Sequence, residues 1–572
     1  MEVSHHQAER FYLKLFFGSF LGLVLLIAVI WGSRDLYVRW QERRLVRRAL
    51  SAMQQGDDNA ASLAARTVLE MKPSSAPAAR VLAELAEKIG NRVALDWRRK
   101  VVQFEPHSVD DALALARCAL QFGNIEMARD ALSGVSEQGK QRGGYHATLA
   151  LIAQREGQDE KADGEWSQAI QLEPDEKGYQ LQQGLLRLRA KQEQKRTAGR
   201  AMLLELRNDP KQRASATRAL ISDGIARHEN SQKLLDLARE LQAYPEATVT
   251  DRLTLLDFLH QAQSPEFAAR LTDVENNVLE RSADLAALIE WMSQSNLNLV
   301  AIDYLRNVPA ADLQKWPVPL ATADLYGRLK DWRKLEEITK DANWRDGEFL
   351  RRAYLARALR GQDKPAAAER EWAAAVKEAS GQGSSLLALV RAASEWNWEK
   401  EMLDLLWTLT RDPDRQNDAI QMLYAYYART DDTQGLYRTL VRWAELAPND
   451  LNIQNNFAQV ALLLDANQQD ARRIAADVYQ KAPSNAAYAT TYAYSLLTKG
   501  NVNAAARVMS SLTPEQLRDP SISAYYGICL AAAHDGKARE FLEIGRQGRL
   551  LPEEKKLVDK ALAGLSTSNT DR

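Results

Sequence analysis

The chain has 572 residues, of which 45% are hydrophobic and 26% are charged, and its formal net charge is −1 at pH 7. This near balance of charge argues against general nucleic-acid binding. A chain of this length exceeds what one compact core can hold, yet no Ser-, Gly- or Pro-rich linker divides it into compact domains. The composition therefore favours an architecture that grows by the addition of similar units.

A charge-free stretch over residues 15–33 is the first element along the chain. It lies between Lys14 and Arg34 and is rich in Leu, Ile, Val and Phe. A helix rises about 1.5 Å per residue, so this stretch spans roughly 28 Å, close to the thickness of the hydrocarbon core. We predict a polar tail over 1–14 and a transmembrane helix over 15–33. The alternative, a cleaved secretory signal, fits less well because residues 30–32 offer no small-x-small cleavage site.

The basic residues on either side of this stretch bear on its orientation. Arg10 and Lys14 precede it, whereas a larger group of arginines follows it, namely Arg34, Arg39, Arg43, Arg44, Arg47 and Arg48. The positive-inside rule then places the remainder of the chain in the cytoplasm. However, the arginines over 43–48 can simply be the solvated face of the next helix, and a short N-terminus often stays cytoplasmic. The sequence favours the cytoplasm over the periplasm and leaves both open.

A short pattern returns almost in register after the apolar stretch. Leu-Ala-x2-Ala begins at Leu82, Leu115 and Leu149, in steps of 33 and 34 residues. Glycines keep the same period, at Gly56, Gly90, Gly123 and Gly157. A fixed period of this size indicates stacked supersecondary units, and about 34 residues is the length of a helix-turn-helix unit. Dividing the rest of the chain by the period gives roughly fifteen helix pairs.

One unit can be followed over residues 143–176. The apolar residues between Tyr145 and Arg155 predict a first helix, and Gly157 supplies the left-handed backbone that ends it. Ala162, Trp166 and Ala169 recur at spacings of three and four, which predicts one buried face on a second helix. Small alanines beside a large indole predict that another helix pair stacks on this face.

The pattern A-x3-W-x2-A-x4-P over Ala162–Pro174 resembles the second-helix signature of tetratricopeptide repeat proteins, with Trp in place of Phe or Tyr, and its core recurs over Ala368–Ala375. The resemblance implies an all-α, right-handed superhelical solenoid of stacked helix-turn-helix repeats. We expect one repeat array over 34–190, diverged helical repeats over 191–345, a second array over 346–565 and a disordered tail over 566–572. The alternative for 191–345 is an inserted separate domain.

The sequence contains no recognisable catalytic or cofactor motif. A GxxxxGK[ST] phosphate loop, a GxGxxG turn, a GxSxG elbow and an HExxH zinc motif are all absent. The seven histidines show no metal-ligand spacing. Cys118 and Cys529 lie in distant repeats, where each is expected to be a small buried apolar residue. We therefore expect neither an enzyme nor a metal or cofactor site.

Two groups of residues are candidates for binding a protein partner. In tetratricopeptide repeats the first helix of each unit lines a concave groove, and the resemblance places long polar side chains there, namely Arg80, Glu84, Lys88, Arg117, Gln121, Gln154 and Arg155. A basic segment that could hold an acidic partner contains Arg187, Arg189, Lys191, Lys195, Arg196 and Arg200. In both cases the alternative is an ordinary solvated helix face. Aromatic residues also cluster, as at Trp396 and Trp398, where core packing competes with partner binding.

These observations lead to a functional hypothesis. We interpret the chain as a single-pass scaffold or adaptor that binds other proteins at a bacterial inner membrane. By analogy with other anchored repeat proteins, its setting would be cell-envelope or polysaccharide assembly. One alternative is an enzyme whose catalytic domain lies within 191–345. Another is a chaperone-like holder of unfolded chains.

Overall fold

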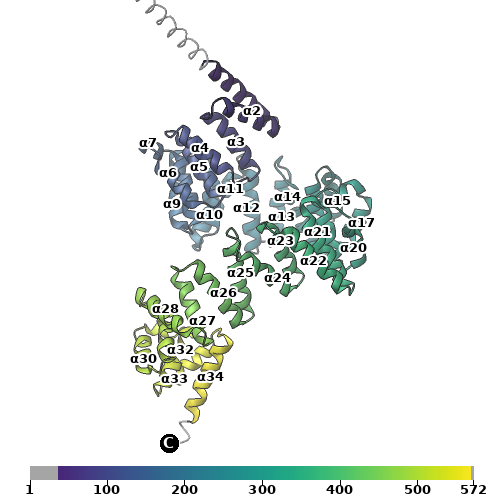
Figure 1. The fold of residues 1–572 in the computed structure, drawn as a ribbon. Coiled ribbons are helices and arrows are strands. Elements are labelled where there is room, and N and C mark those ends of the chain that lie inside the picture. The colour runs from purple at the N-terminus through teal and green to yellow at the C-terminus, as the bar shows by residue number, and fades with distance from the viewer. Residues whose placement is uncertain (1–35, 568–572) are drawn as a thin grey trace, which may run out of the picture. The chain divides into compact units, whose positions relative to one another are not determined.

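A computed structural model of the protein describes residues 36–567 (Figure 1). All regular elements within these residues are helices, and they form two compact units that meet in the sequence at Val278 and Leu279. The predicted tail over 1–14 and the predicted transmembrane helix over 15–33 lie outside the described residues. Within 36–567, no helix is both long and apolar enough to cross a bilayer.

The first unit contains seven helix pairs. Each pair is a hairpin with a short turn, so its two helices run antiparallel, and within the unit each pair packs against the next one. The pairs are 36–54 with α2 (Asp58–Met71), α3 (Ala76–Lys88) with α4 (Ala94–Phe104), α5 (Val109–Gln121) with α6 (Ile125–Ser133), α8 (Gly143–Arg155) with α9 (Asp159–Leu172), α10 (Lys177–Leu188) with α11 (Glu193–Leu206), α12 (Arg213–Ala226) with α13 (Ser231–Gln242), and α14 (Val249–Gln261) with α15 (Phe267–Asn277).

The second unit contains eight pairs and a final helix. The pairs are α16 (Ser282–Gln294) with α17 (Asn298–Asn307), α19 (Val318–Leu329) with α20 (Trp332–Lys340), α21 (Glu348–Gly361) with α22 (Pro365–Ala379), α23 (Gly383–Glu395) with α24 (Glu399–Leu409), α25 (Gln416–Arg429) with α26 (Thr433–Leu446), α27 (Leu451–Leu463) with α28 (Gln468–Lys481), α29 (Ala486–Leu497) with α30 (Val502–Ser510), and α32 (Pro520–Ala532) with α33 (Ala538–Arg546). The final helix is α34 (Pro552–Thr567).

Short helices also lie in the connections of the two units. They are α7 (Glu137–Lys140), η1 (Val278–Glu280), α18 (Ala310–Leu313), η2 (Arg345–Gly347) and α31 (Pro514–Leu517).

The described residues thus confirm a TPR-like α-solenoid with the predicted number of helix pairs. Residues 191–345 contain helices α11 to α20 and no strand, so the helix pairs continue through this segment in both units. The division between the units falls inside this segment. The final helix runs to Thr567, so residues 566 and 567 of the predicted tail are helical, and residues 568–572 lie outside the described part.

The turn inside each pair has a constant backbone feature. In fourteen of the fifteen described pairs the turn includes a residue with a positive φ. Five of these residues are glycines, at Gly56, Gly90, Gly123, Gly157 and Gly500, and the others are His228, Gln263, Asn296, Lys330, Asp363, Asn397, Asp431, Asp465 and His534. A left-handed residue after the first helix satisfies its last carbonyls and reverses the chain, so the turn is conserved in shape although its residue type changes.

Trp166 shows how neighbouring pairs stack. Its side chain is 2% exposed and lies in a cluster of alanines from α8 and α9 together with Leu186 of α10. The ring of Tyr179, at the start of α10, lies 6.0 Å from the indole. The small residues leave space for one large ring between two pairs, which confirms the complementarity predicted from the sequence.

Ion pairs tie successive first helices together at about the period of the repeat. Arg80 of α3 donates to Asp111 of α5 at 2.7 and 2.6 Å, and Arg218 of α12 donates to Asp251 of α14 at 2.8 Å with both nitrogens. Each carboxylate sits in the first turn of its helix and is 6% exposed. Burial alone would raise the pKa of Asp251, but hydrogen bonds from Arg218 and from Thr248 hold that pKa below its ordinary value.

The start of α34 returns to much earlier helices of the second unit. Arg549, just before α34, donates to the carbonyl oxygen of Ala428 in α25 at 2.6 Å. Glu554 accepts hydrogen bonds from Gln459 of α27 at 3.0 Å and from the Tyr525 hydroxyl of α32 at 2.6 Å. Glu553 accepts a hydrogen bond from the hydroxyl of Thr433 at the start of α26. The final helix therefore fastens the pairs between α25 and α33 to one another.

Candidate functional site

The predicted groove residues lie on α3, α5 and α8, which are all first helices of their pairs. Two of them are already engaged within the chain, because Arg80 pairs with Asp111 and Glu105, and Lys88 pairs with Asp58 at 2.8 Å. The others make no side-chain hydrogen bond or ion pair with the described residues: Glu84, Arg117, Gln121 and Arg155 are exposed, and Gln154 is half-buried. These five side chains are therefore available to a partner.

The three first helices α5, α8 and α10 pack side by side. Gly144 of α8 lies so close to its neighbours that a Cβ atom there would stand 3.2 Å from Leu113 of α5 and 3.7 Å from the Tyr179 hydroxyl of α10. The missing side chain allows this approach. Arg117 and Arg155 consequently lie on adjacent helices, where a partner could contact both.

The predicted basic segment is largely neutralised. Four of its six cations pair with carboxylates, as Arg187 does with Asp163, Lys195 with Glu160 and Asp163, Arg196 with Glu193, and Arg200 with Asp223 and Glu193. Only Arg189 and Lys191 are exposed without such a partner among the described residues. The segment therefore carries much less free positive charge than its sequence indicates.

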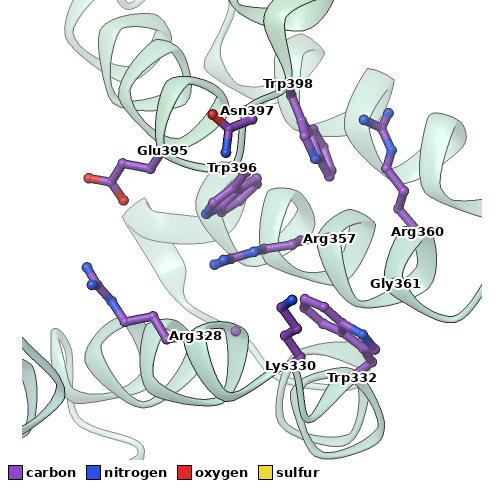
Figure 2. Close-up of a pocket in the computed structure, with 11 residues that line it drawn as sticks. Arg328, Lys330, Trp332, Arg357, Arg360, Gly361, Glu395, Trp396, Asn397 and Trp398 are labelled. Carbon is purple, nitrogen blue, oxygen red and sulfur yellow. The ribbon is translucent and has the colours of Figure 1, made fainter. Parts of the chain in front are cut away.

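A cavity of about 330 Å³ lies in the second unit where three successive first helices end (Figure 2). Its walls come from the ends of α19, α21 and α23, from the turns that follow α19 and α23, and from Trp332 at the start of α20. We call it the Trp–Arg cavity after its principal side chains, Arg328, Lys330, Trp332, Arg357 and Trp396. Its volume is at the lower end of the range of about 300–1,000 Å³ that is usual for ligand pockets.

Arg357 is the central residue of this cavity. Figure 2 shows its side chain extending beneath the Trp396 ring, and its guanidinium carbon lies 4.7 Å from the ring centroid. The side chain is only 15% exposed, and neither Nη1 of Arg357 nor Nε1 of Trp396 has a hydrogen-bond partner within the described residues. Burial lowers the pKa of Arg357 below its ordinary value, but an arginine stays charged at neutral pH.

Two glycines provide the room for these side chains. A Cβ atom on Gly327 would lie 2.5 Å from Nη1 of Arg357, and one on Gly361 would collide with the Trp332 ring. Arg360 stacks on Trp398 with its guanidinium carbon 3.6 Å from the ring centroid, and it pairs with Glu401. Arg360 is thus neutralised, whereas Arg357 is not fully so.

The charges around the Trp–Arg cavity do not balance. Asp324 accepts a hydrogen bond from Arg328 at 2.6 Å, and its other oxygen lies 3.8 Å from Arg357, which is too long for a hydrogen bond. Lys330 and Glu395 also line the cavity, and neither has a hydrogen bond or an ion pair with the described residues. Three cations therefore face two carboxylates, which leaves one positive charge.

Trp396 and Trp398 were candidates from their aromatic clustering in the sequence, but the basic residues that contact them were not predicted. The signal that could have found the cavity is periodic. Lys330, Asp363 and Asn397 are the left-handed residues of three successive turns, 33 and 34 residues apart, so side chains near equivalent turns gather at one edge of the stack. The glycines that mark this period in the first four pairs are absent here.

The described residues also bear on metal coordination and on the reactivity of the two cysteines. No group of three or more His, Cys, Asp or Glu side chains within 36–567 is placed to hold a metal ion. Both cysteines are free and buried, as predicted, and burial raises the pKa of each thiol to about 12. Neither is therefore a thiolate at neutral pH.

No protein-family model matches the chain, and the comparison with curated proteins likewise gives no match. Among solved structures, PilF of Pseudomonas aeruginosa is 18% identical, with a TM-score of 0.32 over 41% of this chain and all of that one. The Cut9–Hcn1 assembly of the APC/C is 12% identical, with a TM-score of 0.30 over 91% of this chain and 96% of that one. MamA of Desulfovibrio magneticus RS-1 is 14% identical, with a TM-score of 0.26 over 29% of this chain and 93% of that one. Likeness at this level carries no argument about function.

Proposed function

We propose that this protein is a scaffold that binds other proteins along the first helices of its repeats. The observation that carries the proposal is a set of polar side chains on α3, α5 and α8 that have no hydrogen-bond or ion-pair partner in the described part of the chain, with Arg117 and Arg155 on adjacent helices. Stacked repeats present such helices as a continuous surface, which suits an extended peptide or a partner helix. Side chains that are already free of internal partners require no bond to be broken when a partner binds.

The proposed place of this scaffold is the bacterial inner membrane. The support is the charge-free apolar stretch over 15–33, which has the length of a bilayer span. The positive charge after that stretch favours a cytoplasmic solenoid over a periplasmic one. A role in cell-envelope or polysaccharide assembly rests only on the resemblance to anchored repeat proteins.

Charge reversal on the first helices tests the proposal. The full-length chain carrying Arg117→Glu and Arg155→Glu is used to capture partners from detergent-solubilised membranes, and these are identified by mass spectrometry. We expect specific partners to be lost or reduced at least tenfold, because each reversed charge opposes a group that the wild-type residue attracts.

A matched control separates this effect from a general change of charge. Arg66→Glu with Lys161→Glu makes the same change in net charge on α2 and α9, which are second helices, at exposed positions. The control should capture the same proteins as the wild type. Equal capture by both double variants would contradict the proposal, provided that their helicity by circular dichroism is unchanged.

A further inference from the structure

We infer that the Trp–Arg cavity binds a carboxylate carried by an acidic segment of a partner protein. This inference rests on the proposed scaffold function and adds a chemical class of partner to it. The cavity belongs to the second unit, whereas the groove residues belong to the first, so the two sites are separate in the sequence and can be tested one at a time.

The charge of the cavity favours an anion. Arg357 is largely buried, and its best carboxylate, Asp324, already accepts from Arg328. A buried charge that is incompletely paired is costly, and an added anion would reduce that cost. Lys330 lies in the turn at the edge of the cavity without a hydrogen-bond or ion-pair partner among residues 36–567, and it can contact an incoming carboxylate directly.

The size of the charge imbalance favours a carboxylate over a phosphate. One unpaired positive charge matches the single negative charge of an acidic side chain. A phosphate group carries about −1.5 to −2 at neutral pH and would leave the cavity negative.

The walls favour a side chain over a larger ligand. Trp332 and Trp396 present indole surfaces beside the cations, as Figure 2 shows. The methylene groups of a glutamate side chain can pack on such surfaces while its carboxylate reaches Lys330. A volume of about 330 Å³ suits one or two side chains of a peptide that passes over the opening.

Calorimetric titration of the full-length chain in a nonionic detergent tests the inference. Three probes are compared at low salt, namely an acetylated pentaglutamate peptide, succinate and inorganic phosphate. We expect saturable binding of the peptide, with succinate and phosphate at least tenfold weaker. Lys330→Glu should weaken peptide binding at least tenfold, because it turns an attractive contact into a repulsive one.

Lys340→Glu is the matched control. It makes the same change at the far end of α20, at an exposed residue that does not line the cavity, and should leave the affinity unchanged. The inference is overturned if the peptide does not bind, if the two variants lose equal affinity, or if phosphate binds more tightly than the peptide. If succinate binds more tightly than the peptide, the carboxylate does not come from a protein segment, and the inference is overturned in that respect. Because purified probes are used, a negative result here leaves the capture experiment with Arg117 and Arg155 unaffected.

Discussion

Trp166 occupies its site by shape alone. The indole is 2% exposed, and its Nε1 has no hydrogen-bond partner within the described residues. Trp166→Ala should destabilise the pairs around it by about 3–5 kcal/mol, because the surrounding alanines cannot collapse far enough to fill the cavity. Hydrogen exchange resolved by peptide should show the loss first in α8, α9 and α10.

The matched change is Trp166→Phe, which keeps a ring in the cluster. Since no hydrogen bond of the indole is lost, the cost should fall to about 1–2 kcal/mol, arising from the smaller buried area. Exchange that rises equally from α2 to α34 in the alanine variant would show that the chain unfolds as one cooperative body, against the local packing described here.

At the left-handed turns, a substitution is expected to raise the stability of the fold instead of lowering it. Gln263 adopts φ 50° between α14 and α15, which costs a side-chain-bearing residue about 1–2 kcal/mol. Gln263→Gly removes this cost, but the greater freedom of glycine in the unfolded chain offsets part of the gain. The substitution should therefore stabilise this pair by about 0.5–1 kcal/mol. Local hydrogen exchange in α14 and α15 measures the change.

Gly157 supplies the reverse experiment. Its φ is +71°, and a Cβ atom there would have no neighbour within 4 Å, so Gly157→Ala changes only the backbone preference. It should destabilise α8 and α9 by about 1 kcal/mol. If both substitutions shift stability in the same direction, the backbone angle is not what governs these turns.

At the level of the helix pair, the buried ion pairs make stacking depend on pH. The pKa of Asp251 is lower in the folded state than its unfolded value of about 3.9. The stabilisation is therefore present above pH about 4 and is lost as the pH falls through the folded pKa. Asp251→Asn should cost about 1–2 kcal/mol at pH 7, a discounted value because the Arg218 side chain remains 36% exposed.

Protection of α12 and α14 against hydrogen exchange, compared between neutral pH and pH 3, measures this effect. The difference between wild type and Asp251→Asn should shrink as the pH falls. Asp236→Asn is the control. The exposed Asp236 carboxylate on α13 makes only a long contact of 3.5 Å with Arg239 of the same helix, so this substitution should change the stability by less than about 0.5 kcal/mol. A pH-independent cost at Asp251 would contradict the role assigned to its charge.

Helix pairs were predictable from the sequence because each turn needs a left-handed residue, and glycine, which adopts that conformation readily, recurs at the period of the repeat. Gly56, Gly90, Gly123 and Gly157 mark four turns directly. From His228 onwards most turns have the same left-handed backbone with other residue types, so the glycine period disappears although the structure continues. Burial of Trp166 followed from the spacing of apolar residues, and burial of both cysteines from their residue type and their positions in distant repeats.

The candidate sites were less predictable because they depend on pairing. Arg187 and Arg200 read as free cations in the sequence, but their carboxylates lie on other helices, at Asp163 and Asp223. The Trp–Arg cavity joins residues of three repeats, and only the packing of α19, α21 and α23 brings Arg357 to Trp396. Charge that is neutralised or gathered by tertiary contacts leaves no local signal.

For the molecule as a whole, the proposed anchor over 15–33 would determine where the proposed scaffold works. Deletion of residues 1–33 should release the chain from carbonate-washed membranes while its helicity is retained, because the helix pairs described here begin after that stretch. Retention of the shortened chain in the washed membranes would contradict the anchor. A phosphatase reporter fused after Arg572 should be inactive for a cytoplasmic solenoid, and strong activity would place the solenoid in the periplasm.

The return of α34 to earlier helices has a consequence for the order of folding. Most contacts join neighbouring pairs and close loops of about one repeat, whereas the bond from Arg549 to Ala428 spans 121 residues. Closing a loop nearly four times longer costs about 1 kcal/mol more in chain entropy, so this contact is expected to form after the local pairs. Docking of α34 would then be the late step that converts a string of independently formed hairpins into a single cooperative body between α25 and α33.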